Sequence, residues 1–258
     1  MKDLAILMPC WKSPELLKVS IPSLLKSTKS KYEIIVILNE ADPESIMYLD
    51  ELKIKHINLE DNIGPSAVDY AIPYIKENNF QYIANVNSDM IFSDNWDIKL
   101  IELLEKNYPC STSCCLIEAI NGGQQIYDVY DFFKEDSHDR FNESVLNGKY
   151  KTNIETSYNH PIMCKTIDFL NVNGYSENLD QSWIDLKGRT LDDYFAYRLL
   201  KLHNDNFKFL KSNEAFVYHG ESLNYKKFNL SRGDSNTANV FLTKTGISIK
   251  EFYNILNI

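Results

Sequence analysis

Two short polar segments and one histidine carry side chains that could bind a metal ion or move a proton. The first is Asn87-Ser88-Asp89, which follows an apolar run ending at Val86. An aspartate at the tip of a buried strand can coordinate a hard divalent cation such as Mn²⁺ or Mg²⁺, which neutralises charge on a departing diphosphate. The same residues also suit an Asx turn or a helix cap. The motif alone leaves these interpretations evenly balanced.

The second segment holds adjacent carboxylates, Asp192 and Asp193, immediately before the apolar pattern of a helix. Either could act as a general base toward a hydroxyl group. A simpler interpretation is that both interact with the dipole at the helix N-terminus, and the residues alone slightly favour it. His219 ends another apolar run. A lone histidine is usually structural, although a neutral imidazole could complete a metal shell.

Polar turns also follow the first three apolar runs of the chain, at residues 9–13, 39–42 and 62–65. In an open parallel sheet, ligands bind outside the carboxyl ends of the strands. Each turn alone means little, because most loops are polar. Their shared position predicts one pocket that also includes residues 87–89.

The elements that must position these residues alternate between strand and helix over the first 107 residues. Buried strands are predicted at 4–8, 33–38, 55–59 and 82–86, and helices after Pro14, at 43–52 and at 66–78. Ser13 is the predicted N-cap of the first helix, with Pro14 at its first position. Strands separated by helices require crossover connections, so the sheet is predicted to be mostly parallel.

The pattern changes from about residue 108 to short strand-prone pieces among polar sequence. Residues 134–159 are predicted to form a loop-like lid or insertion. Helices are predicted at 191–202, with Thr190 as N-cap, and at 248–258, and a strand at 215–219. The absence of repeats and linkers from the sequence predicts one compact domain.

Composition narrows the class of protein. The net charge of -9 argues against a dominant nucleic-acid role, since phosphate backbones are normally bound by basic surfaces. No stretch approaches the roughly 20 apolar residues of a membrane span, and the first apolar run is too short for a signal-peptide core. The five cysteines lack CxxC spacing, which favours reduced thiols and a cytoplasmic location. Cys110, Cys114 and Cys115 are more typical of a buried strand than of a metal cluster.

Taken together, these pieces resemble the family-2-like inverting glycosyltransferases of the GT-A fold. That family's motifs follow a fixed order, and the match here covers most of the chain except roughly residues 108–165. The counterparts are Pro9, residues 39–42, Asn62-Ile63-Gly64, Asn87-Ser88-Asp89, Asn173-Gly174-Tyr175, Leu191-Asp192 with Arg198, and His219.

The resemblance implies an α/β GT-A fold, with a mostly parallel central sheet flanked by helices, in a single domain over residues 1–258. Residues 1–107 would form the nucleotide-sugar-binding half, and residues 108–258 the acceptor-binding and catalytic half. The implied reaction moves a hexosyl or pentosyl group from a nucleotide-diphosphate sugar to an acceptor hydroxyl, with inversion and with Mn²⁺ or Mg²⁺. The acceptor stays open among a glycan, a protein, a lipid-linked sugar and a modified nucleobase.

The resemblance also implies roles for individual residues. Asp89 and His219 would bind the metal, and Asp192 would be the catalytic base, with Asp193 as a partial substitute for the family's neighbouring glutamate. The donor would be bound by Pro9, Cys10, Trp11, Asn39, Asn62, Gly64, Asn87 and Ser88.

Three departures from the family pattern support an alternative. Asn87 replaces the first aspartate of the Asp-x-Asp motif, Leu38 or Asn39 stands where an aspartate is usual, and Leu191 replaces the glutamate. The alternative is a catalytically inactive GT-A-like protein that binds a nucleotide sugar or a glycan. A nucleotidyltransferase fits less well, because residues 9–14 lack a glycine-rich basic loop. Aromatic side chains that could stack on a sugar, although core packing is their commoner use, are Tyr127, Tyr130, Phe132, Phe133 and Trp183.

Overall fold

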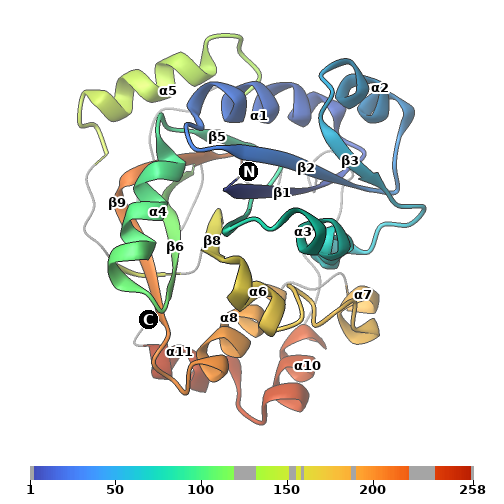
Figure 1. Ribbon diagram of the computed structural model, residues 1–258, viewed down its shortest axis with the longest axis vertical. Helices are drawn as coiled ribbons and strands as arrows, with labels where there is room; N and C mark the ends of the chain where they lie inside the picture. Colours follow the sequence, from blue (N-terminus) through green and yellow to red (C-terminus); the bar gives the residue numbers. More distant parts are fainter. Residues whose placement is uncertain are drawn as a thin grey trace.

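Nine strands form one sheet in the part of the chain that the computed structural model describes, residues 3–118, 132–150, 155–157, 160–186, 190–220 and 236–256. The strand order is β3-β2-β1-β4-β8-β6-β9-β5, and β7 lies beside β9. The strands are β1 (Leu4–Trp11), β2 (Tyr32–Asn39), β3 (Lys55–Asn58), β4 (Tyr82–Asn85), β5 (Met90–Phe92), β6 (Cys110–Glu118), β7 (Glu155–Thr156), β8 (Ile162–Lys165) and β9 (Lys208–His219). The helices are α1 (Pro14–Ser27), α2 (Pro43–Glu51), the 3-10 helix η1 (Gly64–Ala71), α3 (Ile72–Asn78), α4 (Trp96–Asn107), α5 (Ser137–Leu146), α6 (Thr166–Asn171), α7 (Gln181–Leu186), α8 (Leu191–Leu202), α10 (Asn236–Thr245) and α11 (Ile249–Leu256) (Figure 1).

The predicted α/β class and mostly parallel sheet are confirmed. β1 runs parallel to both β2 and β4, β2 runs parallel to β3, and β6 runs parallel to β9. β8 is antiparallel to β4 and β6, and the short strands β5 and β7 are antiparallel to β9. The carboxyl ends of β1 to β4 therefore lie at one rim, as the sequence predicts.

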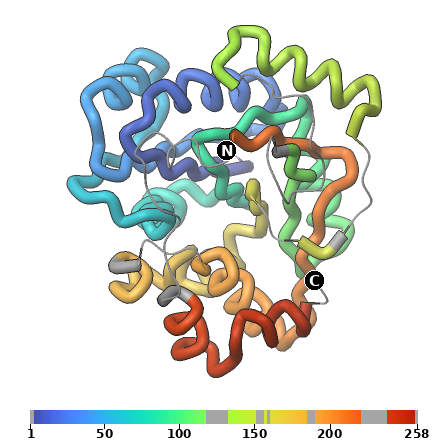
Figure 2. The backbone as a smooth tube through the Cα atoms, turned by 180° about the vertical axis from the view of Figure 1, so that it is seen from behind, coloured from blue at the N-terminus to red at the C-terminus, as the bar shows by residue number. Residues whose placement is uncertain are grey.

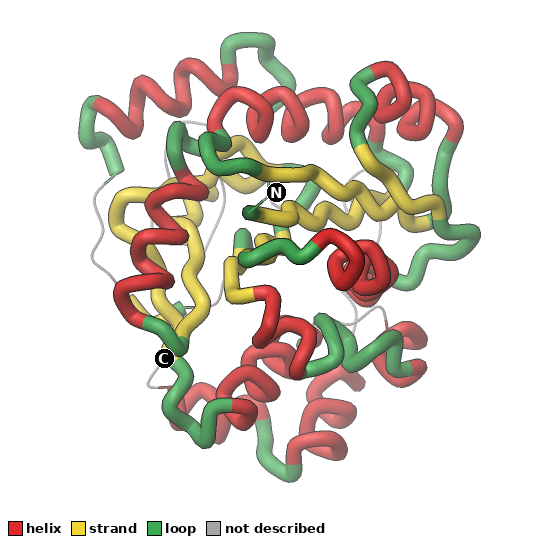
Figure 3. The backbone as a smooth tube through the Cα atoms, in the orientation of Figure 1, coloured by secondary structure: helices red, strands yellow, loops and turns green. Residues whose placement is uncertain are grey.

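Alternate side chains of β1 enter opposite cores, because successive residues of a strand point to opposite faces. Ala5 and Leu7 pack in the core that includes η1, α3, α6 and α8. Leu4, Ile6 and Met8 pack in the second core, with residues of α1, α2 and α4. Helices thus flank the strands on both faces, as Figure 3 shows. α10 and α11 join the first core through Phe241 and Phe252, next to α8 (Figure 2).

A third, aromatic-rich core lies under α5. It joins Phe141 of α5 to Phe216 and Tyr218 of β9 and to Tyr150. The prediction of a loop-like segment at 134–159 is wrong for its first half, which contains α5. Few apolar residues mark that helix in the sequence, so its helical period is hard to detect.

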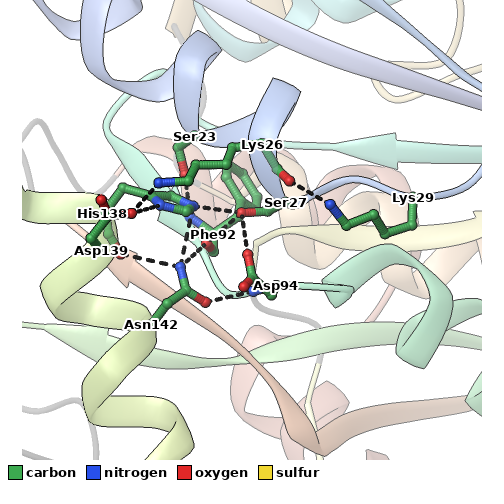
Figure 4. A network of polar contacts seen from close by, with 9 residues as sticks. All are labelled: Ser23, Lys26, Ser27, Lys29, Phe92, Asp94, His138, Asp139 and Asn142. Carbon is green, nitrogen blue, oxygen red and sulfur yellow. Dashed lines mark hydrogen bonds and ion pairs between the residues drawn. The ribbon is translucent and has the colours of Figure 1, made fainter.

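Polar contacts also fix α5 to α1 and β5 (Figure 4). Ser27 lies 2.7 Å from His138 Nε2 and donates to the Phe92 carbonyl at 3.0 Å. The Asn142 side chain accepts a hydrogen bond from the Asp94 amide at 2.6 Å and donates to the Phe92 carbonyl at 3.3 Å. Ser27 is fully buried, so this Ser–His pair is a docking contact that no substrate could reach.

Three local predictions need correction. The helix predicted at 66–78 is divided into the 3-10 helix η1 and α3. Ser13 and Thr190 stand at the predicted cap positions, yet neither side chain forms a capping hydrogen bond. The Ser13 hydroxyl instead donates to the Trp11 carbonyl at 2.8 Å.

All five cysteines are buried and free, and those of the 110–115 segment lie in β6.

Candidate functional site

The ends of β1 and β2 meet in a group of polar and aromatic side chains. Trp11 Nε1 donates to Glu40 Oε2 at 3.0 Å, and Lys12 forms an ion pair with the same carboxylate. Lys12 and Glu40 both have positive φ, 44° and 49°, so each strand turns sharply as it ends. Glu40 lies in the predicted turn at 39–42 but was given no role of its own, and its carboxylate stands beside Trp11.

Asn39 links the second and third of these strand ends. Its side-chain amide donates to the Gly64 carbonyl at 3.0 Å and accepts from the Ile63 amide at 3.2 Å. Asn62 caps the same turn, because its side chain accepts from the Gly64 amide at 2.9 Å. Asn39 is almost fully buried. Its side chain therefore shapes the turn at residues 62–64.

Asp89 and His219 lie side by side at the next strand end. The Asp89 Oδ1 to His219 Nε2 distance is 3.2 Å, and the Asn87 side-chain nitrogen is 3.4 Å from the same ring nitrogen. Asp89 is only 8% exposed. Burial alone would raise the pKa of Asp89, but the charge and hydrogen bond of His219 outweigh it and lower the pKa below its usual value.

Serine side chains of α1 hold the backbone around Asp89. The Ser20 hydroxyl donates to the Ser88 carbonyl at 2.5 Å and accepts from the Met90 amide at 3.2 Å. One turn later, the Ser23 hydroxyl accepts from the Phe92 amide at 2.8 Å. Ser20 and Ser23 are buried, and β5 is the last strand of the sheet in the described part of the chain, so these bonds pair backbone groups on its outer edge. The segment carrying Asp89 is fixed on both flanks.

Asn87, Asp89 and His219 suit a divalent cation by their chemistry. They offer amide and carboxylate oxygens and one imidazole nitrogen, a set that accepts Mn²⁺ or Mg²⁺ and leaves coordination positions for a diphosphate. Among the described residues, no group of three or more His, Cys, Asp and Glu side chains could hold a metal ion. A cation here would need the amide of Asn87 or oxygens from a ligand.

Asp192 lies at the N-terminus of α8 and meets two further polar side chains. The Tyr175 hydroxyl donates to Asp192 Oδ1, and His160 Nε2 lies 3.5 Å from Oδ2. The Asp192 side chain is 40% exposed to solvent, so a substrate can still reach the carboxylate. Burial would raise the pKa of Asp192, but the charge and hydrogen bond of His160, together with the Tyr175 bond, lower it. The carboxylate is therefore ionised at neutral pH.

The turn that carries Tyr175 is held from both sides. The buried carboxylate of Asp69, in η1, accepts from the backbone amides of Tyr175 and Ser176 at 2.5 and 2.8 Å. From α8, the Arg198 guanidinium donates to the carbonyls of Gly174 and Tyr175 at 3.0 and 2.5 Å. Burial raises the pKa of Asp69, although the hydrogen bonds that its carboxylate accepts from Tyr175 and Ser176 oppose the shift. Arg198 thus acts on the backbone of the turn.

Asp193 faces a different neighbour from Asp192, because successive helix residues are separated by about 100° around the axis. Its Oδ1 accepts from the Tyr253 hydroxyl of α11 at 3.1 Å, and the residue is 7% exposed. The two adjacent carboxylates therefore contact different groups.

Cys10 and Ser88, both predicted to bind the donor, lie behind the rim. The Cys10 thiol is buried against the Ser13 carbonyl at 3.9 Å, and burial raises its pKa to about 12. Among the aromatic candidates, Phe132 and Trp183 are buried in the cores, whereas Phe133 is 52% exposed. Tyr127 and Tyr130 lie outside the described residues. His160 and Asp69 were missing from the predicted site, and Tyr175 was named only as part of the Asn173-Gly174-Tyr175 motif, without a role.

The matched family model is named "Glycosyl transferase family 2", and it covers residues 5–170. Since that range is more than half of the sequence, the chain belongs to this family. Asp192 and His219 lie beyond the matched range. Among curated proteins, none gives a significant match.

Solved structures show the same fold. The chain is 13% identical to S. aureus TarS with a TM-score of 0.61, covering 99% of this chain and 42% of TarS. The structure of TarS residues 1–349 with UDP-GlcNAc gives 12% identity and a TM-score of 0.60, covering 99% of this chain and 70% of that one. GalNAc-T7 with UDP, GalNAc and Mn²⁺ gives 15% identity and a TM-score of 0.61, covering 98% and 56%. This chain therefore spans less than half of the first of these TarS chains, and the likeness defines its fold as GT-A.

In the described part of the chain, none of the helices has both the length and the apolar character needed to cross a membrane.

Proposed function

We propose that this glycosyltransferase moves a sugar from a nucleotide-diphosphate donor to an acceptor hydroxyl, with inversion and with a divalent cation. The observation that carries the proposal is a pair of Asp–His contacts at one rim of the sheet. Asp89 meets His219 at 3.2 Å, and Asp192 meets His160 at 3.5 Å. Two ionised carboxylates with separate partners suit two separate roles.

The first pair belongs to the donor in this proposal. Asp89 and His219, with Asn87, would hold Mn²⁺ or Mg²⁺, which would neutralise charge on the leaving diphosphate. The rim formed by Pro9, Trp11 and residues 62–64 would bind the nucleotide, while Asn39, Cys10 and Ser88 support it from behind. TarS with UDP-GlcNAc and GalNAc-T7 with UDP and Mn²⁺ support this type of donor.

The second pair belongs to the acceptor. Asp192 takes the proton of the acceptor hydroxyl as that oxygen attacks the anomeric carbon from the side opposite the diphosphate. A bond forms between the acceptor oxygen and the anomeric carbon, and the bond from that carbon to the diphosphate breaks. Inversion follows from this single displacement. Asp193 has no direct part, since it is turned toward Tyr253.

The test combines a donor panel with one substitution. Purified protein with Mn²⁺ and a series of nucleotide sugars should release nucleoside diphosphate from at least one donor. Asp192→Asn should lower that rate by about 10²- to 10⁴-fold, the usual contribution of a general base, while diphosphate affinity stays unchanged. Wild-type rates in this variant would remove Asp192 from the role, and lack of binding to every nucleotide diphosphate would refute the donor assignment.

Donor binding without turnover would instead support the alternative of an inactive GT-A-like protein that binds a nucleotide sugar or a glycan. Asn87 motivates that alternative, because an amide stands where the family pattern has a carboxylate. A cytoplasmic location stays part of the proposal, supported by the five buried free thiols.

A further inference from the structure

His160 lies beside the carboxylate of Asp192 and was part of no motif. Its Nδ1 is 3.2 Å from the backbone carbonyl oxygen of Asn85, the last residue of β4. Its Nε2 is 3.1 Å from the Tyr175 hydroxyl and 3.5 Å from Asp192 Oδ2. The His160 side chain is only 15% exposed, so these protein groups are its main hydrogen-bond partners.

The positions of the hydrogen atoms follow from the chemistry of these partners. A backbone carbonyl can only accept, so Nδ1 must carry a hydrogen. The single Tyr175 proton goes to Asp192 Oδ1, and a side-chain hydrogen bond links Asn85 to the same hydroxyl group. The groups facing Nε2 are therefore the lone pairs of the Tyr175 oxygen and an ionised carboxylate. Nε2 must also donate, which makes the ring an imidazolium.

From this geometry we infer that His160 is a positioning residue for sugar transfer, a buried cation that holds Asp192 ionised and correctly oriented. The inference rests on the proposed role of Asp192 as base. Tyr175 and His160 together occupy one oxygen each of the carboxylate, which restricts its rotation and leaves the 40% exposed part for the acceptor. A bound donor would add negative charge nearby, which favours protonation of Asp192. The positive charge of His160 offsets this effect.

The charged neighbours of His160 agree with this state. Burial lowers the pKa of His160, but Asp192 and the Asn85 carbonyl outweigh burial and raise it, against a smaller opposing effect of His219. The charge of His160 in turn contributes to the low pKa of Asp89. Tyr175 keeps its proton, since burial and the charge of Asp192 raise its pKa well above the usual value.

The experiment pairs nitrogen NMR of the histidine rings with the pH profile of kcat. At pH 7.5 both ring nitrogens of His160 should be protonated in the wild-type protein, and Asp192→Asn should yield a neutral ring. In His160→Gln the acid limb of the kcat profile should move up by about one to three pH units, because Asp192 loses its cation. The donor KM should stay within about twofold, since the substitution leaves the Asp89–His219 contact in place.

The chain offers a matched control at the other end of α8. His203 lies 3.0 Å from the buried carboxylate of Asp168, which also accepts from the Tyr108 hydroxyl at 3.2 Å. His203 follows α8, about 16 Å along the helix from Asp192. His203→Gln removes the same kind of contact and should leave the acid limb unchanged.

Two results would overturn the inference: a neutral His160 in the wild-type protein, or an acid limb that does not move in His160→Gln. The NMR result needs no turnover. A protein without transferase activity would therefore refute the proposed function while the state of His160 is still measured.

Discussion

Gly174 lies at the centre of the turn that positions Tyr175, and it provides the sharpest test of the site's architecture. Its φ is +81°, and a Cβ there would come 2.5 Å from Asp69 Oδ1 and 2.6 Å from Ile72 Cδ1. The carboxylate of Asp69 is fixed by the Tyr175 and Ser176 amides, so it cannot move aside without losing those bonds. Gly174→Ala should therefore destabilise the protein by two separate effects.

The two effects can be given magnitudes. A left-handed backbone conformation costs a non-glycine residue roughly 1–2 kcal/mol. Forcing an added carbon into a packed site costs typically about 1–3 kcal/mol more. The sum is a loss of about 2–5 kcal/mol in the free energy of unfolding for Gly174→Ala. A Cβ at position 174 should also shift the turn and displace Tyr175. This displacement should weaken the contact of Tyr175 with Asp192 and lower kcat.

Gly246 isolates the first effect. It also has positive φ, +76°, but nothing lies within 4 Å of its Cβ position. Gly246→Ala should cost only about 1–2 kcal/mol in urea unfolding at an unchanged m-value. If Gly174→Ala costs no more than Gly246→Ala, the close contact with Asp69 is not what defines this turn.

Three further outcomes are expected. Asp69→Asn should cost about 1–3 kcal/mol in urea unfolding, because an amide NH₂ would face backbone donors of the turn; an equally stable variant would contradict this. Asn142→Ala removes a bridge between α5 and the β5 segment and should cost about 1 kcal/mol, seen as faster amide exchange in α5; unchanged exchange would show that the aromatic core suffices. His219 lowers the pKa of Asp89 in the folded protein below its value in the unfolded chain. The ionised carboxylate therefore stabilises the fold at pH values above the unfolded pKa, and this stabilisation is lost as the pH falls through the folded pKa. Acid unfolding of Asp89→Asn should therefore depend less steeply on pH below about 4 than that of the wild type, and equal slopes would refute the effect.

The fold could be predicted from the sequence where the signal is local. Buried runs such as residues 4–8 and 33–38 and the helix at 191–202 match β1, β2 and α8 closely. Segments stabilised by tertiary contacts gave no such signal. α5 is attached through Phe141 and a polar network, and α10 had no predicted counterpart. The 3-10 helix η1 begins with Gly64 and Pro65, a start that the helical period of the later residues concealed.

The candidate site also contains some contacts that the sequence suggests and others that depend on tertiary packing. Asp89 closely follows the strand predicted at 82–86, and His219 ends the strand predicted at 215–219, so sequence position alone could suggest that they meet. The amide of Asn39 was expected to face a ligand, but its contacts with Ile63 and Gly64 depend on how two strand ends pack. Tyr175 is a turn residue whose hydroxyl reaches Asp192 across the fold, a contact that no local spacing encodes.

Strand register explains why two Asp–His pairs form at the same rim. β5 is antiparallel to β9, with Met90 opposite His219, and the Gly220 amide donates to the Asp89 carbonyl at 2.8 Å. β8 is antiparallel to β4, with Asn85 opposite Ile162, so residues just before β8 return to the end of β4. His160 is two residues before Ile162 and meets the Asn85 carbonyl there. A shift of one residue in either pairing would turn the paired side chains to the other face of the sheet. The antiparallel pairing of β8 with β4 and of β9 with β5 thus brings His160 and His219 to one rim. The other side chains at this rim come mainly from the ends of parallel strands.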